Sequence, residues 1–170
     1  MNKNQKIAVI GSGYWGTIII KTLIELKFNN ITIFDKSTKN KKIAKKKFKS
    51  IKFQNNFTNI LNDKDMLNVF VVTPPSENFL IVKKLILNNK NIFLEKPGFK
   101  NVKDIKKIKN YLKKSRSKLM FGYIYYYNAY IEKIKEIIDR KMLGKIQYIS
   151  FNRKNLGPIR NDVDVDYDLT

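Results

Sequence analysis

Three glycines near the N-terminus have the spacing of a phosphate-binding turn. Gly11, Gly13 and Gly16 form the pattern G-x-G-x-x-G between an apolar run at residues 7–10 and an apolar, helix-like run at residues 17–26. In such a strand–turn–helix unit, the first glycine permits the tight turn, the second lets the backbone approach a pyrophosphate, and the third lets the helix close onto the sheet. The N-terminus of the helix adds free N–H groups and a partial positive charge. We therefore expect a dinucleotide to be bound by the whole turn, Gly11, Ser12, Gly13, Tyr14, Trp15 and Gly16.

An acidic residue lies at the expected separation from this turn. Asp35 ends a second apolar run, ITIFD, 19 residues after Gly16. A carboxylate about 20 residues downstream can bind the hydroxyls of an adenosine ribose and would repel a 2′-phosphate, which favours NAD over NADP. Lys36 and the lysines behind it could still tolerate that phosphate, so NADP stays possible. If the glycines served packing alone, no carboxylate would be needed here, so Asp35 favours the dinucleotide site.

Two later apolar runs, at residues 68–76 and 91–98, end in further candidate site residues. These are Thr73, Pro74 and Pro75 in the first run, and Glu95 and Lys96 in the second. Ligands bind at the carboxyl ends of strands in an open α/β sheet, so both groups are expected to face the cofactor. The alternatives are a rigid turn for the prolines and an ordinary surface position for Lys96.

Lys96 has the side-chain chemistry for proton transfer. If burial or a nearby cation lowers its pKa, the amine could take a proton from a hydroxyl group. As an ammonium ion it would instead polarise a carbonyl oxygen during reduction. Glu95 could bond this lysine or a ribose, and Pro97 fixes the backbone after it.

The periodicity of apolar residues predicts an α/β fold. Six β segments alternate with helical segments, as in a Rossmann-type doubly wound parallel sheet with helices on both faces. The predicted strands are residues 7–10, 31–35, 51–54, 68–76, 91–98 and 118–123. The predicted helices are residues 17–26, 36–50, 77–89 and 101–115, with a weak helix around residues 60–61. Residues 1–122 are expected to form one NAD(P)-binding domain.

Residues 123–170 differ in character. Aromatic residues at 123–130 precede a predicted helix at 131–144, which Gly144 would end, and a strand-like alternating segment at 145–155. About 50 residues cannot bury a sufficient core alone. We expect this segment either to pack on the first domain or to begin an α+β open-sheet domain that is incomplete here.

Composition narrows the functional classes. No apolar run in the 170 residues approaches the roughly 18 of a membrane span, and MNKNQK leads into the first strand without a signal-peptide core, so a cytoplasmic location is expected. The absence of cysteine excludes disulfides and thiolate metal sites, and the absence of histidine removes the commonest general base. The run DVDVD lacks the glycine and glutamate of a calcium loop, so no metal is expected.

The net charge of +21 has two explanations: a surface for nucleic acid or membranes, or a general bias towards lysine, asparagine and isoleucine. The lysines spread over most predicted helices, arginines number only four, and no aromatic-plus-basic stripe resembles a base-stacking surface. We favour the bias, and expect neither nucleic acid nor a membrane as partner.

These motifs resemble the Gfo/Idh/MocA family of oxidoreductases over almost the whole chain. The matching segments are GSGYWG at 11–16, Asp35, TPP at 73–75, EKP at 95–97 and NRKNLGPIRNDVDVDYDL at 152–169. The last segment is similar to the branch that acts on nucleotide-linked amino sugars, such as UDP-N-acetylglucosamine-type 3-dehydrogenases.

The resemblance implies hydride transfer between NAD, or NADP, and a hydroxyl carbon of a sugar or nucleotide-linked sugar. Lys96 matches the EKP lysine, which lies beside the nicotinamide and the reacting carbon in the family. Asp168 matches the aspartate of a D-x-x-x-H segment, whose histidine would fall two places beyond Thr170. Lys96 and Asp168 are thus the expected catalytic residues. The family also has a second, open-sheet domain that shapes the substrate pocket and usually makes a homo-oligomer.

The C-terminal segment offers candidates for substrate binding. Arg153 and Arg160 could bind a phosphate or carboxylate, or pair with the nearby aspartates at 162, 164 and 166. Tyr123 could stack on nicotinamide or sugar, although aromatic runs more often belong to a core. The expected substrate-binding residues are Lys96, Asn128, Arg153, Asn155, Arg160 and Asp168, and Tyr123 is expected to contact the cofactor.

The alternative function is a dinucleotide-binding module without catalysis of its own, or one half of a split enzyme. The missing histidine favours this alternative for the chain taken alone. A third hypothesis, a nucleic-acid-binding protein, is supported by the net charge only.

Overall fold

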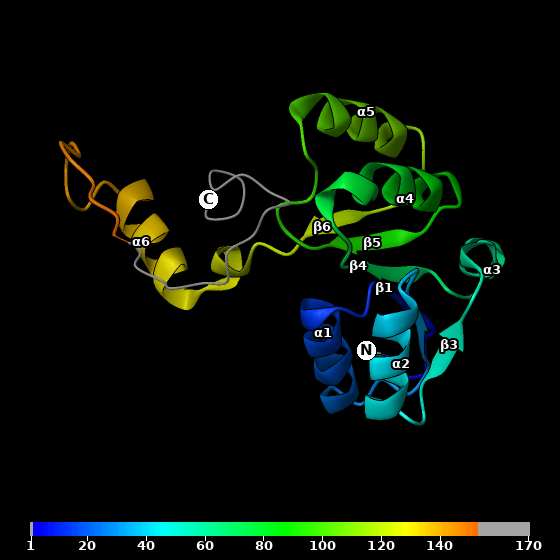
Figure 1. The fold of residues 1–170 in the computed structure, drawn as a ribbon. Coiled ribbons are helices and arrows are strands. Elements are labelled where there is room, and N and C mark those ends of the chain that lie inside the picture. The colour runs from blue at the N-terminus through cyan, green and yellow to red at the C-terminus, as the bar shows by residue number, and fades with distance from the viewer. Residues whose placement is uncertain (1, 153–170) are drawn as a thin grey trace.

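A parallel sheet of six strands organises the described part of the chain (Figure 1). The structure is a computed structural model and describes residues 2–152. The strand order is β3-β2-β1-β4-β5-β6, and every neighbouring pair is parallel. The strands are β1 Ile7–Ile10, β2 Ile31–Phe34, β3 Lys52–Gln54, β4 Asn68–Val71, β5 Asn91–Leu94 and β6 Leu119–Phe121. The order reverses between β1 and β4, which confirms the predicted doubly wound sheet and places its switch point there.

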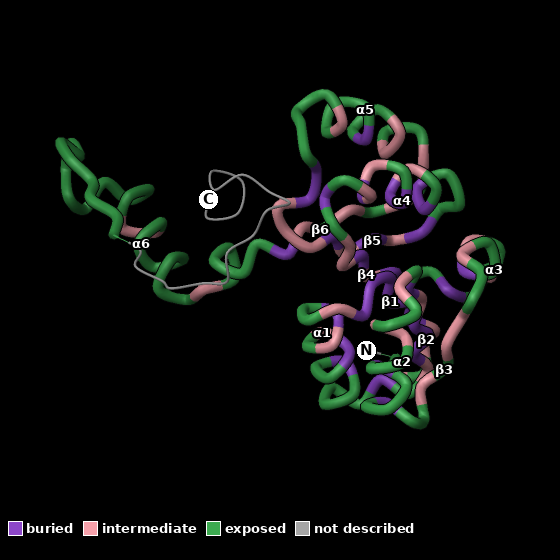
Figure 2. The backbone as a smooth tube through the Cα atoms, in the orientation of Figure 1, coloured by how far each residue is buried: buried purple, intermediate pink, exposed green. Residues whose placement is uncertain are grey.

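Two groups of helices cover the two faces of this sheet (Figure 1). On one face, α1 (Tyr14–Glu25) and α2 (Thr38–Lys47) pack against β1 and β2. On the other face lie α3 (Phe57–Asn62), α4 (Pro75–Leu87) and α5 (Val102–Lys113). Strands covered on both faces need apolar side chains throughout, and all four residues of β1 are buried. Figure 2 shows the buried residues concentrated on the central strands.

Several helices begin earlier, and strands end sooner, than the sequence predicts. α1 begins at Tyr14, inside the glycine turn, rather than at residue 17. α4 begins at Pro75, whose fixed φ suits a first helical turn. β4 and β5 end at Val71 and Leu94, because proline cannot donate to a strand ladder and each strand is followed closely by one.

The residues after β6 form an arm that extends away from the sheet (Figure 1). A 3-10 turn, η1 (Ile124–Tyr127), leads into α6 (Ala129–Asp139), and neither element contains a buried residue. The aromatic run is therefore exposed and does not form a core. α6 ends before Gly144 because Lys141 takes the left-handed conformation, with φ 52°, that usually closes a helix.

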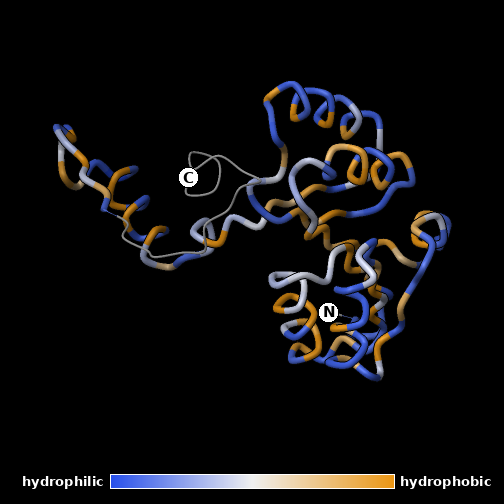
Figure 3. Tube along the Cα trace, viewed as in Figure 1, coloured by the Kyte–Doolittle hydropathy of each residue, from blue (hydrophilic) through white to orange (hydrophobic). Residues whose placement is uncertain are grey.

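Hydrophobic and hydrophilic residues alternate along α6 (Figure 3). Ile131, Ile134 and Ile138 recur at helical spacing and are all exposed, so α6 has an apolar face that nothing in the described chain covers. Within residues 2–152, no helix is long and apolar enough to cross a membrane.

The predicted strand at residues 145–155 is wrong for the part that the structure describes. Residues 145–152 are all exposed and pair with no strand of the described chain. A single extended segment leaves its backbone N–H and C=O groups without ladder partners. Alternating side chains therefore do not make a strand where no neighbouring strand is available.

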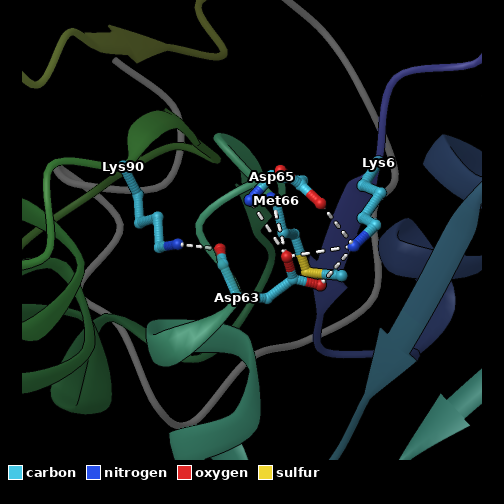
Figure 4. A network of polar contacts seen from close by, with 5 residues as sticks. All are labelled: Lys6, Asp63, Asp65, Met66 and Lys90. Atoms are coloured by element: carbon cyan, nitrogen blue, oxygen red, sulfur yellow. Dashed lines mark hydrogen bonds and ion pairs between the residues drawn. The ribbon is translucent and has the colours of Figure 1, made fainter.

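A polar network ties α3 to the amino edge of the sheet, opposite the glycine turn (Figure 4). The Lys6 Nζ donates to both carboxylate oxygens of Asp63, at 3.1 and 3.0 Å, and to Asp65 Oδ2 at 3.1 Å. Asp63 Oδ1 also accepts from the N–H groups of Asp65 and Met66. Lys90, almost fully buried, donates to the main-chain oxygen of Asp63.

The network predicts a loss of stability in acid. Burial, the largest influence on Asp63, raises its pKa, but the hydrogen bonds from Lys6 and the Asp65 N–H outweigh burial and lower the pKa below its ordinary value. The unfolded chain therefore takes up this proton first, so the stabilisation is present above about pH 4 and is lost as the pH falls through the lowered pKa. Asp63→Asn should lower the free energy of unfolding by about 1 kcal/mol at pH 7, and this difference should shrink below about pH 4.

Denaturant unfolding of wild type and variant at several pH values measures this effect. Asp65→Asn is the matched control, because the Asp65 side chain is 79% exposed, and it should change stability by only a few tenths of a kcal/mol. If the difference in free energy of unfolding between wild type and Asp63→Asn did not vary with pH, the stabilising role assigned to the Asp63 carboxylate would be contradicted.

Candidate dinucleotide site

The glycine turn leaves the carboxyl end of β1 and enters α1 directly. Gly11 has φ +95°, and a Cβ added there would lie 2.3 Å from the main-chain oxygen of Val72. A Cβ on Gly16, in the first turn of α1, would lie 2.1 Å from the main-chain oxygen of Gly11. Backbone contacts on both sides therefore exclude side chains at these two positions, so these glycines make the turn and the close helix approach that the spacing predicts.

Gly13 lies in open space. A Cβ added to it would meet nothing closer than the Asn40 Nδ2, at 4.0 Å. Gly13 is the N-cap of α1 and its helix has no side-chain cap and no acidic residue in its first turn. The first N–H groups of α1 are thus available to an anion, with Tyr14 and Trp15 exposed beside them.

Asp35 connects the end of β2 to the glycine turn. Its Oδ2 accepts from the Ser12 N–H at 2.7 Å, from the Ser12 Oγ at 2.9 Å and from the Asn40 Nδ2 at 3.4 Å. Its Oδ1 accepts from the Ser37 N–H at 2.7 Å. The carboxylate is only 7% exposed, and Oδ1 has a second lone pair for a hydroxyl group.

Ser37 and Asn40 belong to this site although their sequence positions did not predict it. Ser37 is also the N-cap of α2, where its hydroxyl accepts from the Asn40 N–H. A serine followed by a helical run is a recognisable cap signal, but its contact with Asp35 depends on the turn between them.

Lys36 and Glu77 form an ion pair from opposite sides of β1. The Lys36 Nζ lies 2.8 Å from the Glu77 Oε2. Lys36 follows β2, whereas Glu77 belongs to the first turn of α4, which follows β4. Glu77 is a third residue of the site that was not expected from the sequence, because its partner is 41 positions away.

A buried amide joins the segment after β4 to the segment after β5. The Thr73 Oγ1 donates to the Asn78 Oδ1 at 2.6 Å, and the Asn78 Nδ2 donates to the main-chain oxygen of Gly98 at 2.6 Å. Asn78 is 1% exposed. Its only sign in the sequence of a role at this edge is that it is a polar residue within an apolar helix. Pro74 is the N-cap of α4 and Pro75 is its first residue. The threonine and prolines therefore shape this edge of the site.

Glu95 and Lys96 follow β5 directly. The Glu95 Oε2 accepts from the Lys96 N–H at 2.9 Å, and burial of the Glu95 carboxyl raises its pKa. A Cβ at Gly122 would lie 2.8 Å from the Glu95 Oε1, so this glycine makes room for the carboxylate. The Lys96–Pro97 peptide bond is cis. Both side chains are half-buried at the carboxyl edge, where a substrate beside the cofactor could reach them.

The remaining candidates lie on the arm or outside the described residues. Tyr123 stacks on Phe121, with ring centroids 5.6 Å apart and an interplanar angle of 26°. The Asn128 Oδ1 caps α6 by accepting from the N–H groups of Tyr130 and Ile131. Arg153, Asn155, Arg160 and Asp168 lie outside the described residues. Among residues 2–152, no group of three or more histidine, cysteine, aspartate or glutamate side chains is placed to hold a metal ion.

The structure thus brings five segments to one edge of the sheet. The glycine turn follows β1, Asp35 follows β2, Thr73 follows β4, Lys96 follows β5, and Tyr123 follows β6. In a parallel sheet these ends share one edge, and the switch point between β1 and β4 is where such sheets bind ligands. This arrangement provides N–H groups for phosphates, a carboxylate for hydroxyls, and an amine for proton transfer.

Comparison with known proteins gives one family match. The model of the Gfo/Idh/MocA oxidoreductase family, an NAD-binding Rossmann fold, matches residues 5–123. A comparison with curated proteins gives no match.

Several solved structures share the fold. An oxidoreductase from Desulfitobacterium hafniense has a TM-score of 0.75 and 20% identity, over 85% of this chain and 42% of that chain. Myo-inositol 2-dehydrogenase from Lactobacillus plantarum has a TM-score of 0.73 and 18% identity, over 84% of this chain and 43% of that chain. Scyllo-inositol dehydrogenase from Lactobacillus casei was solved with NAD(H) and scyllo-inositol. It has a TM-score of 0.70 and 20% identity, over 83% of this chain and 42% of that chain.

The chain spans less than half the length of these solved structures. At 18–20% identity their likeness shows the fold alone. The family model, in contrast, covers most of the chain and all of the six-stranded sheet. The chain therefore belongs to the Gfo/Idh/MocA oxidoreductase family and carries its NAD-binding Rossmann fold.

Proposed function

We propose that the chain binds NAD(H) across the carboxyl edge of its sheet as part of an oxidoreductase that acts on a hydroxyl carbon of a sugar, cyclic polyol or nucleotide-linked sugar. The observation that carries this proposal is the open position at Gly13, beside the buried Asp35 carboxylate and at the switch point of the sheet. The inositol dehydrogenase from Lactobacillus casei, which shares the fold, supports it because that protein holds NAD(H) and scyllo-inositol.

The chain's residues have separate roles in this proposal. The N–H groups of the glycine turn bind the pyrophosphate, and the free lone pair of the Asp35 Oδ1 accepts from an adenosine ribose hydroxyl. Bound nicotinamide supplies or accepts the hydride. The Lys96 amine gives or takes the proton at the substrate hydroxyl oxygen, and the neighbouring Glu95 helps to position it. Asp168 is proposed to act in catalysis and to bind substrate, by its match to the family. Arg153, Asn155 and Arg160 are proposed to bind substrate, the two arginines through guanidinium groups that suit a phosphate or carboxylate.

The division of the chain into domains is part of the same proposal. Residues 1–122 would be the cofactor domain, and residues 123–170 would begin the substrate and oligomerisation domain. The exposed apolar face of α6 supports this division, because such a face normally packs against another element. A homo-oligomer is proposed for a longer polypeptide that includes this chain.

A second candidate is a dinucleotide-binding module without catalysis, or one half of a split enzyme. The absence of histidine from the sequence favours it. The two candidates differ in one measurement: both bind NADH, but only the first, alone or within a longer polypeptide, reduces NAD when supplied with a sugar or polyol.

Substitution of Lys96 tests the enzymatic proposal. Lys96→Met keeps most of the length of the side chain but removes the amino group proposed to transfer the proton. It should lower kcat by at least about 100-fold for NAD reduction with the best substrate from a panel of sugars and cyclic polyols, and change the Kd for NADH by less than about threefold. Lys100→Met, four residues away and exposed, should leave both values unchanged. Normal turnover by Lys96→Met would contradict the role assigned to Lys96.

A further inference from the structure

We propose that Glu77 makes the site prefer NAD over NADP by holding Lys36 in an ion pair, a specificity role that rests on the dinucleotide binding proposed above. Lys36 follows Asp35 directly, and Asp35 is the residue proposed to bind the adenosine ribose. Glu77 comes from the far side of β1.

The geometry of the pair places it across the site. β1 lies between β2 and β4 in the sheet, and the glycine turn leaves β1 at the same edge. The contact of 2.8 Å between the Lys36 Nζ and the Glu77 Oε2 therefore joins the segment after β2 to the first turn of α4, across the carboxyl end of β1. The Lys36 side chain is 68% exposed and that of Glu77 is 38% exposed, so both can rearrange when a ligand enters.

The charges around the ribose position decide which cofactor is tolerated. The Asp35 carboxylate is paired only with neutral donors among the described residues: Ser12, Ser37 and Asn40. No described cation pairs with this carboxylate, and a carboxylate beside the ribose disfavours a 2′-phosphate. Lys36 is the adjacent cation that could offset this repulsion, but Glu77 neutralises it. A 2′-phosphate would have to compete with the Glu77 carboxylate for the Lys36 ammonium group, and that competition weakens NADP binding.

Removing the Glu77 charge should free Lys36 for the phosphate. Glu77→Gln keeps the size of the side chain and is expected to lower the Kd for NADPH about threefold to tenfold, because an exposed ion pair contributes only a modest energy. The Kd for NADH should stay within about twofold, since NADH has no 2′-phosphate. The gain should shrink at high salt, as expected for a contact between exposed charges.

Two further variants separate this contact from general charge effects. Lys36→Met/Glu77→Gln should bind NADPH no more tightly than Lys36→Met, which distinguishes Lys36 from the lysines of α2. Glu25→Gln removes the same charge from a similar exposed pair, Lys21–Glu25 at 3.6 Å near the C-terminal end of α1, and should leave the ratio of the Kd values for NADPH and NADH unchanged.

Titration of each purified variant with NADH and NADPH measures both constants. The proposal is overturned if Glu77→Gln leaves the ratio unchanged, if the gain persists without Lys36, or if Glu25→Gln produces the same gain. In these cases the binding of NADH by the wild type would still support the proposed function. Failure of the wild type to bind either cofactor would instead overturn the dinucleotide site itself, and the specificity role with it.

Discussion

Gly13→Val is expected to abolish NADH binding while leaving the fold intact. A Cβ added at Gly13 would lie 4.0 Å from the Asn40 amide and meet nothing nearer apart from its chain neighbours, so the free energy of unfolding should change by no more than about 1 kcal/mol. The same side chain would occupy the space through which the backbone approaches a pyrophosphate. We expect the affinity for NADH to fall at least about 100-fold, which corresponds to about 2.8 kcal/mol.

Gly16→Ala is the matched control for this prediction. Its Cβ would lie 2.1 Å from the main-chain oxygen of Gly11, and neither backbone can move without disturbing β1 or α1. We expect a loss of about 3 kcal/mol or more in the free energy of unfolding, with binding lost through the fold. Denaturant unfolding and NADH titration of both variants test the pair. A Gly13→Val protein that unfolded as easily as Gly16→Ala, or that bound NADH normally, would contradict the prediction.

Asp35→Asn should impair both stability and binding, although it changes only one atom. The carboxylate accepts from two main-chain N–H groups, one at each oxygen: those of Ser12 and Ser37. An asparagine amide has a single acceptor oxygen, so one of these N–H groups would face an NH₂ donor. Leaving a buried donor unpaired costs about 1–3 kcal/mol, and we expect a loss of about 2 kcal/mol in the free energy of unfolding. The affinity for NADH should fall at least about tenfold, since the variant lacks the charge that we propose holds the ribose.

Ser12→Ala provides the control for Asp35→Asn. It removes the hydroxyl donor at 2.9 Å but keeps both main-chain N–H groups paired with the carboxylate. The free energy of unfolding is expected to fall by less than about 1 kcal/mol. Equal losses for the two variants, measured by denaturant unfolding, would show that the charge and its paired N–H groups are not what stabilises the turn.

The sheet and the glycine turn could be predicted because the information for them is local. Strand–glycine–helix spacing fixes the turn, and Asp35 follows at a set distance along the same chain. Each of the six strands lies within an apolar run that predicted it, because buried parallel strands have few polar residues.

The contacts that complete the edge of the site could not be predicted, because each joins segments that are distant in sequence. Asn78 links Thr73 to Gly98, Glu77 pairs with Lys36, and Gly122 makes room for Glu95. None of these pairs has a characteristic spacing; each depends on which strand ends meet at the carboxyl edge. The strand expected at residues 145–155 failed for a related reason, since a strand requires a partner that a periodic pattern cannot supply.

Trp15 allows the central claim to be measured directly. It is the only tryptophan in the sequence, it lies in the glycine turn, and it is 50% exposed. NADH bound at this turn should quench the Trp15 emission in a saturable way and gain nicotinamide emission by energy transfer. We expect saturation at one site per chain in the wild type and none in Gly13→Val. Absence of saturable quenching in the wild type up to about 1 mM NADH, or equal saturation in Gly13→Val, would contradict dinucleotide binding at this turn.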